Sequence, residues 1–328
     1  MVFSQPTGLT GRRPRPSAPL APTLGLARLL TALLLAAPLM AQMSPSAREA
    51  MWPAPSAEDW ARPCGITWQR TWDDAVAVSE ETGKALLICV NMDGEIASEH
   101  YAGIRYRQPE ITALYEPYVC VIASVYRHTP RDHDEDGARV ECPRFGTVTC
   151  GEHIAMEPIV YEKYLDGRRI SPRHIMVELD GSEVYDVFYA FDTQSLFDAI
   201  ERGISERDVQ PTPVVRGDRS LLEKVASRDV VDREEVEQAY AAGDAATRKA
   251  LLEAALATGE GAPVDLLRQG IYGFDTELAG LARKALAQAD SPAAIDLIPE
   301  ALQVALGTDE REQLVAALER LGRTSTKA

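Results

Sequence analysis

The amino-acid sequence predicts an α/β domain followed by an all-α domain, and three observations carry this prediction. Two continuous apolar runs, 85–90 and 118–126, have the length and content of buried parallel strands. Asp180-Gly181 separates two further strand-like stretches, which is a strong hairpin signal. From residue 219 onward, Ala, Leu, Glu and Arg recur with the spacing of amphipathic helices.

Composition supports a globular protein and excludes several classes. The chain has 328 residues, enough for about two domains, with 45% hydrophobic and 26% charged residues. Acidic residues outnumber basic ones 50 to 34, which gives a net charge of −16. Because nucleic acids and anionic lipids attract basic surfaces, we expect no nucleic-acid partner.

The first 41 residues have the pattern of a signal peptide. Four arginines lie between residues 12 and 28, and a short apolar run, Leu29–Ala41, follows them. This run is too short to span a bilayer, so we expect cleavage and no stable membrane insertion afterwards. The mature chain is then extracytoplasmic, either periplasmic or secreted. Residues 42–66 are rich in Pro, Ala and Ser and are predicted to form a tether.

The α/β domain is predicted to cover residues 67–205. Its first helix starts at Thr71, which forms a capping-box-like pattern with Asp74, and stops at Gly83, immediately before the first strand. Helical stretches from about Glu95 to Tyr106 and from Pro109 to Tyr115 connect this strand to the second one. After the hairpin, Asp192 is expected to cap a helix with four apolar residues on one face: Leu196, Phe197, Ile200 and Ile204.

This order of elements resembles the thioredoxin fold, from about Trp68 to Ile204. The segments that carry the resemblance are "GKALLICV" as the central strand and "RISPRHIMVELDG", in which Pro172 takes the place of the family's cis-proline. Thioredoxins have Cys-x-x-Cys after the central strand, whereas the corresponding end positions here are Glu95 and Ser98. The resemblance therefore implies a redox-inactive domain, because dithiol exchange needs both sulfurs. We expect Glu95 to cap the helix.

A long insertion, 127–170, stands where thioredoxins have a short connection, and long irregular insertions are often functional. It contains Cys142, Cys150 and His153, a donor set that suits zinc or copper. A closed site needs a fourth ligand, and the candidates are His174, His128, His133 and Cys64. The alternative is a Cys142–Cys150 disulfide bond, which an oxidising compartment favours. Near the end of the insertion, "EPIVYEKY" is expected to form a short helix with Pro158 in its first turn.

The insertion also contains the acidic motif "DHDEDG". Asp132, Asp134 and Asp136 alternate before Gly137, as the oxygen ligands of calcium loops do. The bidentate glutamate of an EF-hand would fall at Pro143, so the match is partial. The alternative is a solvated acidic loop.

A linker, 206–218, precedes a helical domain at 219–328. The segment "RKAL" occurs at Arg248–Leu251 and again at Arg283–Leu286, a spacing of 35 residues. This repetition of short helices resembles a degenerate HEAT-type array, and the resemblance implies a surface that binds another protein. Helices are expected near 220–228, 232–242, 244–257, 263–271, 275–289, 292–306 and 309–322.

Three functional hypotheses follow from these features. The first is a redox-inactive binding or assembly module, and the second is a metal-binding module built in the insertion. The third is a thiol-disulfide or peroxide oxidoreductase that uses Cys142 or Cys150 unconventionally. The sequence contains no Walker loop, dinucleotide fingerprint or zinc-protease motif, so whether the protein is an enzyme at all stays open, with a binding role favoured.

Overall fold

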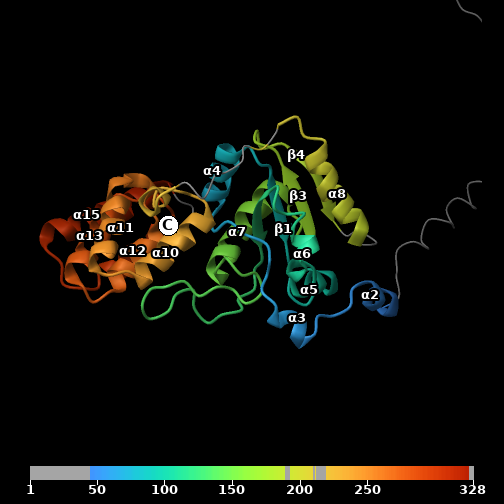
Figure 1. Cartoon of the computed structure of the whole chain (residues 1–328), viewed down its shortest axis with the longest axis horizontal. Coiled ribbons are helices and arrows are strands. Elements are labelled where there is room, and N and C mark those ends of the chain that lie inside the picture. The colour runs from blue at the N-terminus through green and yellow to red at the C-terminus, as the bar shows by residue number, and fades with distance from the viewer. Residues whose placement is uncertain (1–44, 189–192, 210, 212–218, 325–328) are drawn as a thin grey trace, which may run out of the picture. The chain divides into compact units, whose positions relative to one another are not determined.

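The computed structural model describes residues 45–188, 193–209, 211 and 219–324 (Figure 1). The predicted signal peptide, Asp192 and most of the predicted linker lie outside these residues. The chain divides into two compact units, 1–48 and Glu49–Ala328. The second unit contains both the sheet part, residues 52–209, and the helical part, residues 219–324. The domain boundaries predicted within this unit remain predictions.

The sheet has four strands in the order β2-β1-β3-β4. They are β1 (Leu86–Val90), β2 (Val119–Ala123), β3 (Arg173–Val177) and β4 (Glu183–Phe188). β1 and β2 pair in parallel and are fully buried, which confirms the interpretation of the two apolar runs. β3 pairs antiparallel with β1 and β4, and Gly181 turns the predicted hairpin with φ of 82°. The result is a mixed α/β sheet.

Alternate side chains of the strands enter two separate apolar clusters, so the sheet is buried on both faces. On one face they meet α5 (Ile96–Gly103) and α8 (Thr193–Ser205). On the other face they meet α4 (Trp72–Thr82) and α7 (Cys150–Tyr164). Figure 1 shows α4 and α7 on one side of the strands and α8 on the other.

Several local predictions are confirmed. Thr71 caps α4, and Gly83 ends it in the left-handed region with φ of 66°. The backbone N–H of Ser98 donates to the Glu95 carboxylate at 2.7 Å, so Glu95 is the expected helix cap of α5. A short 3-10 turn, η1 (Arg105–Arg107), and α6 (Pro109–Thr112) then lead to β2.

The α7 helix differs from the prediction. The sequence interpretation placed a short helix at "EPIVYEKY", with Pro158 in its first turn, but the helix starts at Cys150 and runs for 15 residues through Pro158. Thr149 and Glu152 form a capping box at its N-terminus, with the Thr149 hydroxyl accepting from the Glu152 N–H. This Thr-x-x-Glu pattern is present in the sequence and marks the start of the helix at Cys150. Pro158 favours a helix start nearby, but here it is accommodated within the helix.

The predicted tether contains helices α2 (Pro45–Met51) and α3 (Ala57–Ala61), and its later residues pack on the sheet part. Trp52 and Ile66 are 1% and 2% exposed and belong to its apolar core. The guanidinium group of Arg107 lies 5.1 Å from the centre of a Trp60 ring. Residues 52–66 therefore form part of the folded structure rather than a free tether.

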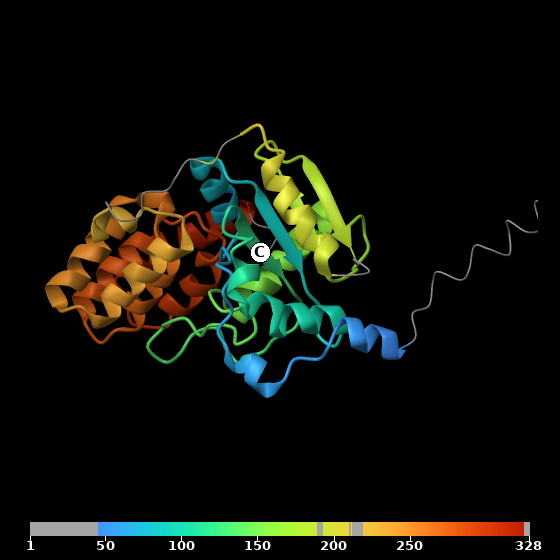
Figure 2. The same cartoon turned by 45° about the vertical axis from the view of Figure 1, so that its right-hand side comes forward.

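The helical part follows the predicted sequence of helices closely. Its elements are α9 (Leu221–Lys224), α10 (Val230–Ala242), α11 (Ala245–Ala257), η3 (Gly259–Gly261), α12 (Val264–Tyr272), α13 (Thr276–Leu286), α14 (Ala294–Ala301) and α15 (Thr308–Thr324). Figure 2 shows these helices packed side by side, and they share one apolar core. Within the described ranges, no helix is long and apolar enough to cross a membrane.

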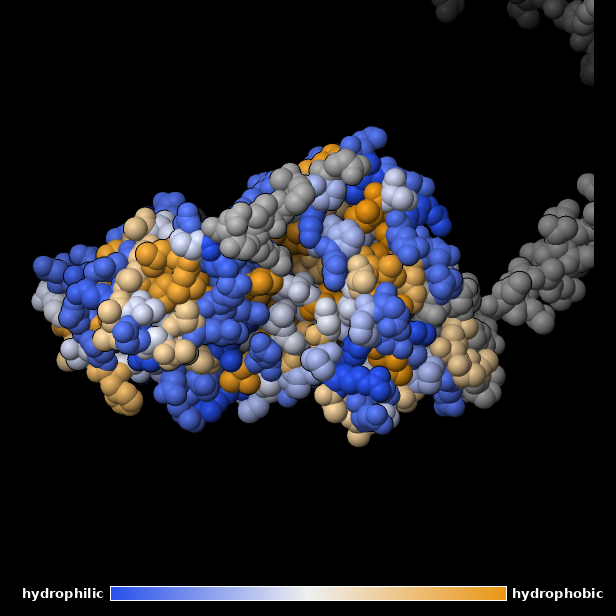
Figure 3. Space-filling model, in the orientation of Figure 1, coloured by the Kyte–Doolittle hydropathy of each residue, from blue (hydrophilic) through white to orange (hydrophobic). Residues whose placement is uncertain are grey.

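Ion pairs join the sheet part to the helical part. Asp74 on α4 accepts from Arg228 at 3.0 Å and from Arg233 at 2.9 Å. The sequence interpretation assigned Asp74 to a capping box with Thr71, but its side chain is committed to these arginines instead. Arg70 donates to Asp265 on α12 at 3.0 Å and to Glu237 on α10 at 3.1 Å. The face drawn in Figure 3 is mostly hydrophilic, in keeping with the charge of the chain.

Candidate metal centre

Four side chains gather at one edge of the sheet part: His128, Cys142, Cys150 and His153. Each offers one ligand atom, and the four atoms lie within 4.8 Å of one another. Cys142, Cys150 and His153 are at most 1% exposed. In the part of the chain that the structure describes, no other group of three or more His, Cys, Asp or Glu side chains could hold a metal.

The fold explains why these residues meet. β1 and β2 are parallel, so the segments that follow them, with Asp93 and His128, leave the same end of the sheet. Cys150 is the first residue of α7, and His153 lies on the same helix face one turn later. The loop that carries Cys142 is turned back by a hydrogen bond from the Gly146 N–H to the Cys142 carbonyl at 2.8 Å.

His153 presents an unused lone pair to this group. Its Nδ1 lies 3.0 Å from the Ser124 carbonyl, which fixes Nδ1 as the N–H donor. Its Nε2 is buried and has no hydrogen-bond partner. Burial lowers the pKa of His153 to about 4, so the ring is neutral at pH 7. A neutral imidazole with one nitrogen tied to a carbonyl has the form in which histidine binds metals.

His128 is held in a similar way from the opposite side. Its Nε2 lies 2.9 Å from the Asp93 carboxylate, and its Nδ1 lies 3.2 Å from the Cys142 sulfur and 3.8 Å from the Cys150 sulfur. Burial lowers the pKa of His128, but the hydrogen bonds with Asp93 and Cys142 outweigh burial and raise it to about 10. A metal ion bound at Nδ1 would therefore displace a proton.

The Cys150 sulfur is placed to carry negative charge. It accepts hydrogen bonds from the backbone N–H of His128 at 3.1 Å and from the Thr129 hydroxyl at 3.2 Å, and it lies at the N-terminus of α7. Burial raises the pKa of this thiol, but the hydrogen bonds from Thr129 and His128 outweigh burial and lower it. The thiolate is the form that binds metals.

These distances suit a tetrahedral zinc ion. Zinc bonds of about 2.0 to 2.3 Å imply ligand-to-ligand distances of about 3.3 to 3.8 Å, close to the observed distances from His128 to both sulfurs. Two imidazoles and two thiolates form a closed set, as in structural zinc sites. Asp93 and the Ser124 carbonyl are the outer-shell partners that such sites need.

The other proposed fourth ligands lie elsewhere. His174 is on β3, where its Nε2 lies 3.1 Å from the Tyr115 hydroxyl and 3.3 Å from the Tyr106 hydroxyl. His133 lies 3.6 Å from the Asp265 carboxylate, and Cys64 belongs to the edge of the apolar core. Sequence reasoning named His128 as one of four alternatives, and the structure places His128 alone among them at the centre. The sequence did not indicate Asp93, because its contact with His128 depends on the pairing of β1 and β2 and not on a local motif.

The acidic motif does not gather its carboxylates. Asp132 pairs with Arg127 at 2.8 and 2.9 Å and accepts from the Gly151 N–H at 2.7 Å. Asp134 accepts from the N–H groups of Asp136 and Ala138 within its own turn. Asp136 is exposed. These carboxylates serve the loop and the start of α7, so the geometry gives no support for the expected calcium site.

The remaining predicted site residues do not form a disulfide bond or a dithiol site. All five cysteines are free, so Cys142 and Cys150 are not joined in a disulfide bond. Ser98 is fully buried on α5, and Pro172 follows a cis peptide bond. Neither a protein-family model nor a curated protein matches this chain, so the case for the metal centre rests on its own geometry.

Proposed function

We propose that this protein binds one zinc ion through His128, Cys142, Cys150 and His153. The observation that carries the proposal is the buried Nε2 of His153, which has no hydrogen-bond partner in a group that also contains two free thiols. A buried polar atom without a partner costs about 1 to 3 kcal/mol, and a metal bond would offset that cost. Copper has similar ligands and is the alternative ion.

The ion would hold the insertion against the sheet. Its ligands come from the segment after β2, from the loop before α7 and from α7 itself. The segment between β2 and α7 contains no helix or strand, and it joins the apolar core through Phe145 and Val148. Zinc binding would therefore contribute directly to the stability of this region, as in other small structural zinc sites.

We propose further that the sheet part is a redox-inactive, thioredoxin-like domain. The strand order, the cis-proline before β3 and the helix after β1 support this likeness. Glu95 and Ser98 stand at the positions of the family's two cysteines and supply no thiol. We propose that the helices, which share one apolar core, form a HEAT-like array that binds another protein. The proposed compartment is extracytoplasmic and rests on the signal-peptide pattern of the sequence.

Metal analysis of the purified full-length protein tests the zinc proposal. We expect about one zinc per chain in the wild type and in a Cys120→Ala control, which removes a buried thiol outside the centre. The Cys150→Ser and His153→Gln variants should lose the metal, with circular dichroism reporting whether they fold. A folded wild type without metal, or one whose mass shows a Cys142–Cys150 bridge after purification under reducing conditions, would overturn the proposal.

A second candidate function is thiol chemistry, favoured by the line of contacts from Asp93 through His128 to Cys142. Carboxylate, imidazole and thiol at 2.9 and 3.2 Å resemble the arrangement that activates nucleophilic cysteines. Both cysteines are at most 1% exposed, so a protein disulfide could not reach them, and this second candidate function is limited to a small oxidant such as a hydroperoxide. Turnover of peroxide by metal-stripped protein with a thiol reductant, lost in Cys142→Ser, would support this function.

A further inference from the structure

A cavity of about 340 Å³ lies between the sheet part and the helical part. We call it the α7 cleft, because α7 supplies much of one wall and the start of α4 the rest, while α12 and the start of α14 supply the other wall. Its volume falls in the range of small-molecule sites. None of the four residues of the metal centre lines it, so it is a separate feature.

Much of the wall is apolar. The sheet part contributes Trp72, Met156 and Ile159, and the helical part contributes Val264, Pro292 and Ala293. Surfaces of this kind bind the apolar body of a ligand, while a few polar groups fix its orientation.

The charge of the cleft is negative. Five carboxylates line it, against two guanidinium groups; the carboxylates belong to Asp73, Asp132, Glu152, Asp265 and Asp296, and the guanidinium groups to Arg70 and Arg268. When the ion-pair partners Arg127, Arg139, Glu237 and Glu300 are included, seven carboxylates face four guanidinium groups, a net charge of −3. A low-dielectric wall strengthens the field of such a cluster and favours a cation.

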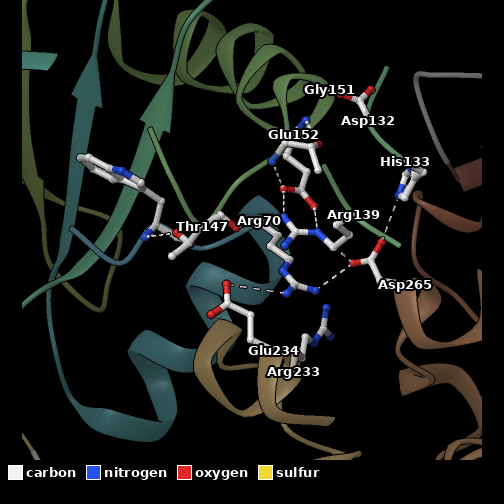
Figure 4. Close-up of polar contacts among 12 residues, drawn as sticks. Arg70, Asp132, His133, Arg139, Thr147, Gly151, Glu152, Arg233, Glu234 and Asp265 are labelled. Atoms are coloured by element: carbon white, nitrogen blue, oxygen red, sulfur yellow. Dashed lines mark hydrogen bonds and ion pairs between the residues drawn. The ribbon is translucent and has the colours of Figure 1, made fainter. Parts of the chain in front are cut away.

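Most donor atoms of the cleft arginines bind protein carboxylates, although the Nε of Arg70 and the Nε of Arg268 are buried without a hydrogen-bond partner among the described residues. Figure 4 shows Arg70 and Arg139 side by side between Glu152 and Asp265. Arg139 donates to Glu152 at 3.2 Å, Arg70 donates to Asp265 at 3.0 Å, and the two guanidinium side chains are only 5% and 2% exposed. Asp73, by contrast, is exposed in the first turn of α4 and has no hydrogen-bond or ion-pair partner in the described ranges. Three of the other lining carboxylates pair with arginines: Asp132, Glu152 and Asp265. Asp73 is therefore the carboxylate left for a ligand, in a cleft whose summed charge is negative.

We propose that the α7 cleft binds a small organic cation with an apolar body, such as an aryl-alkyl amine or guanidine. The apolar body would lie against Trp72, Met156 and Ile159, and the cationic end would face the carboxylates, Asp73 among them. The site is formed before the ligand arrives, because the buried ion pairs hold both walls. This proposal goes beyond metal binding and does not depend on it.

Calorimetry with the full-length protein tests the proposal using two matched probes. The first probe is 4-phenylbutylamine, and the second is 4-phenylbutan-1-ol, which has the same apolar body without the charge. We expect the amine to bind at least about tenfold more tightly than the alcohol, and the difference to shrink at high salt. Equal affinities, or no binding of the amine at millimolar concentration, would overturn the proposal.

Two variants localise the binding. Asp73→Asn should weaken the amine severalfold and leave the alcohol unchanged, whereas Glu80→Gln, an exposed acidic position on the same helix but outside the cleft, should leave both unchanged. Ala155→Phe should fill the cleft and abolish binding of both probes. Equal effects of the two acidic variants would place the amine elsewhere and reject the site. Zinc content measured in the same samples keeps this outcome separate from a failure of the metal centre.

Discussion

His174 shows how burial by aromatic neighbours fixes the protonation of a single residue. The ring is 1% exposed, and two tyrosine hydroxyls lie within 3.3 Å of its Nε2. Burial lowers its pKa to about 3, so it stays neutral in the folded protein at pH 7. His174, two residues after the cis-proline Pro172, thus belongs to a buried aromatic cluster rather than to a ligand site.

This burial predicts a pH dependence of stability. Between pH 6.5 and about 3 the unfolded chain binds a proton at His174 and the folded chain does not, so stability falls as the pH falls through this window and is complete above it. The loss can reach a few kcal/mol. Urea unfolding at a series of pH values should show that the free energy of unfolding falls less steeply with falling pH in His174→Gln than in the wild type. Equal pH dependences would contradict the lowered pKa of His174.

At the residue scale, the sequence allowed three of the four proposed metal ligands to be named as candidates. Cys142, Cys150 and His153 lie within twelve residues of one another, and their types alone indicate a soft metal. His128 was one of four alternatives, since choosing it requires knowing that its segment leaves the sheet beside α7. The orienting role of Asp93 depends on the β1–β2 pairing, which local sequence does not encode.

At the scale of elements, the N-terminal turn of α7 has several separate roles. Thr149 caps the helix, Cys150 belongs to the metal centre, and Glu152 binds Arg139. Because these residues are adjacent, the helix cap also positions a proposed ligand. The strands and most helix bounds followed from the periodicity of apolar residues. The start of α7 did not, because it is set by the capping box of Thr149 and Glu152.

A cap substitution separates these roles. Thr149→Ala should cost about 1 kcal/mol of unfolding free energy, and Thr71→Ala at the cap of α4 should cost a similar amount. Only Thr149→Ala should also weaken zinc binding, because α7 carries two of the proposed ligands, Cys150 and His153, whereas α4 carries none. Urea unfolding and a competition assay with a zinc chelator measure the two effects; equal zinc affinities in the two variants would show that the cap does not position Cys150.

At the scale of the whole molecule, buried ion pairs join the sheet part to the helical part. Arg70 and Glu237 are 167 positions apart in the chain, and Asp74 and Arg233 are 159 apart. Helical and strand periodicity say nothing about such pairs, and the sequence offers many acidic partners for each arginine. The composition predicted two parts, but it could not predict this contact between them.

Substitution of Asp265, which accepts from Arg70, tests the contribution of this contact between the sheet part and the helical part. Burial raises the pKa of Asp265, but a hydrogen bond with His133 and the charges of Arg70 and Arg139 outweigh burial and hold it below its usual range. Its contribution is therefore complete above about pH 4 and is lost as the pH falls further. Asp265→Asn should destabilise the protein by about 3 kcal/mol, since it leaves buried arginines underpaired. Thermal unfolding should show this loss, with an exposed Glu312→Gln variant unchanged.

The same N-terminal turn of α7 has a consequence for how this protein can evolve. A Cβ atom at Gly151 would lie 2.4 Å from an oxygen of the Asp132 carboxylate, so alanine there requires that side chain to move. Thr149, Cys150 and Glu152 are each held by a different neighbour. Each of these four consecutive positions thus has a contact that a substitution would disturb, and Thr149 and Glu152 share theirs in the capping box. We expect fewer neutral substitutions here than at the exposed positions of the acidic loop, because one change can disturb the helix cap, the candidate metal centre and the contact with Asp132 together.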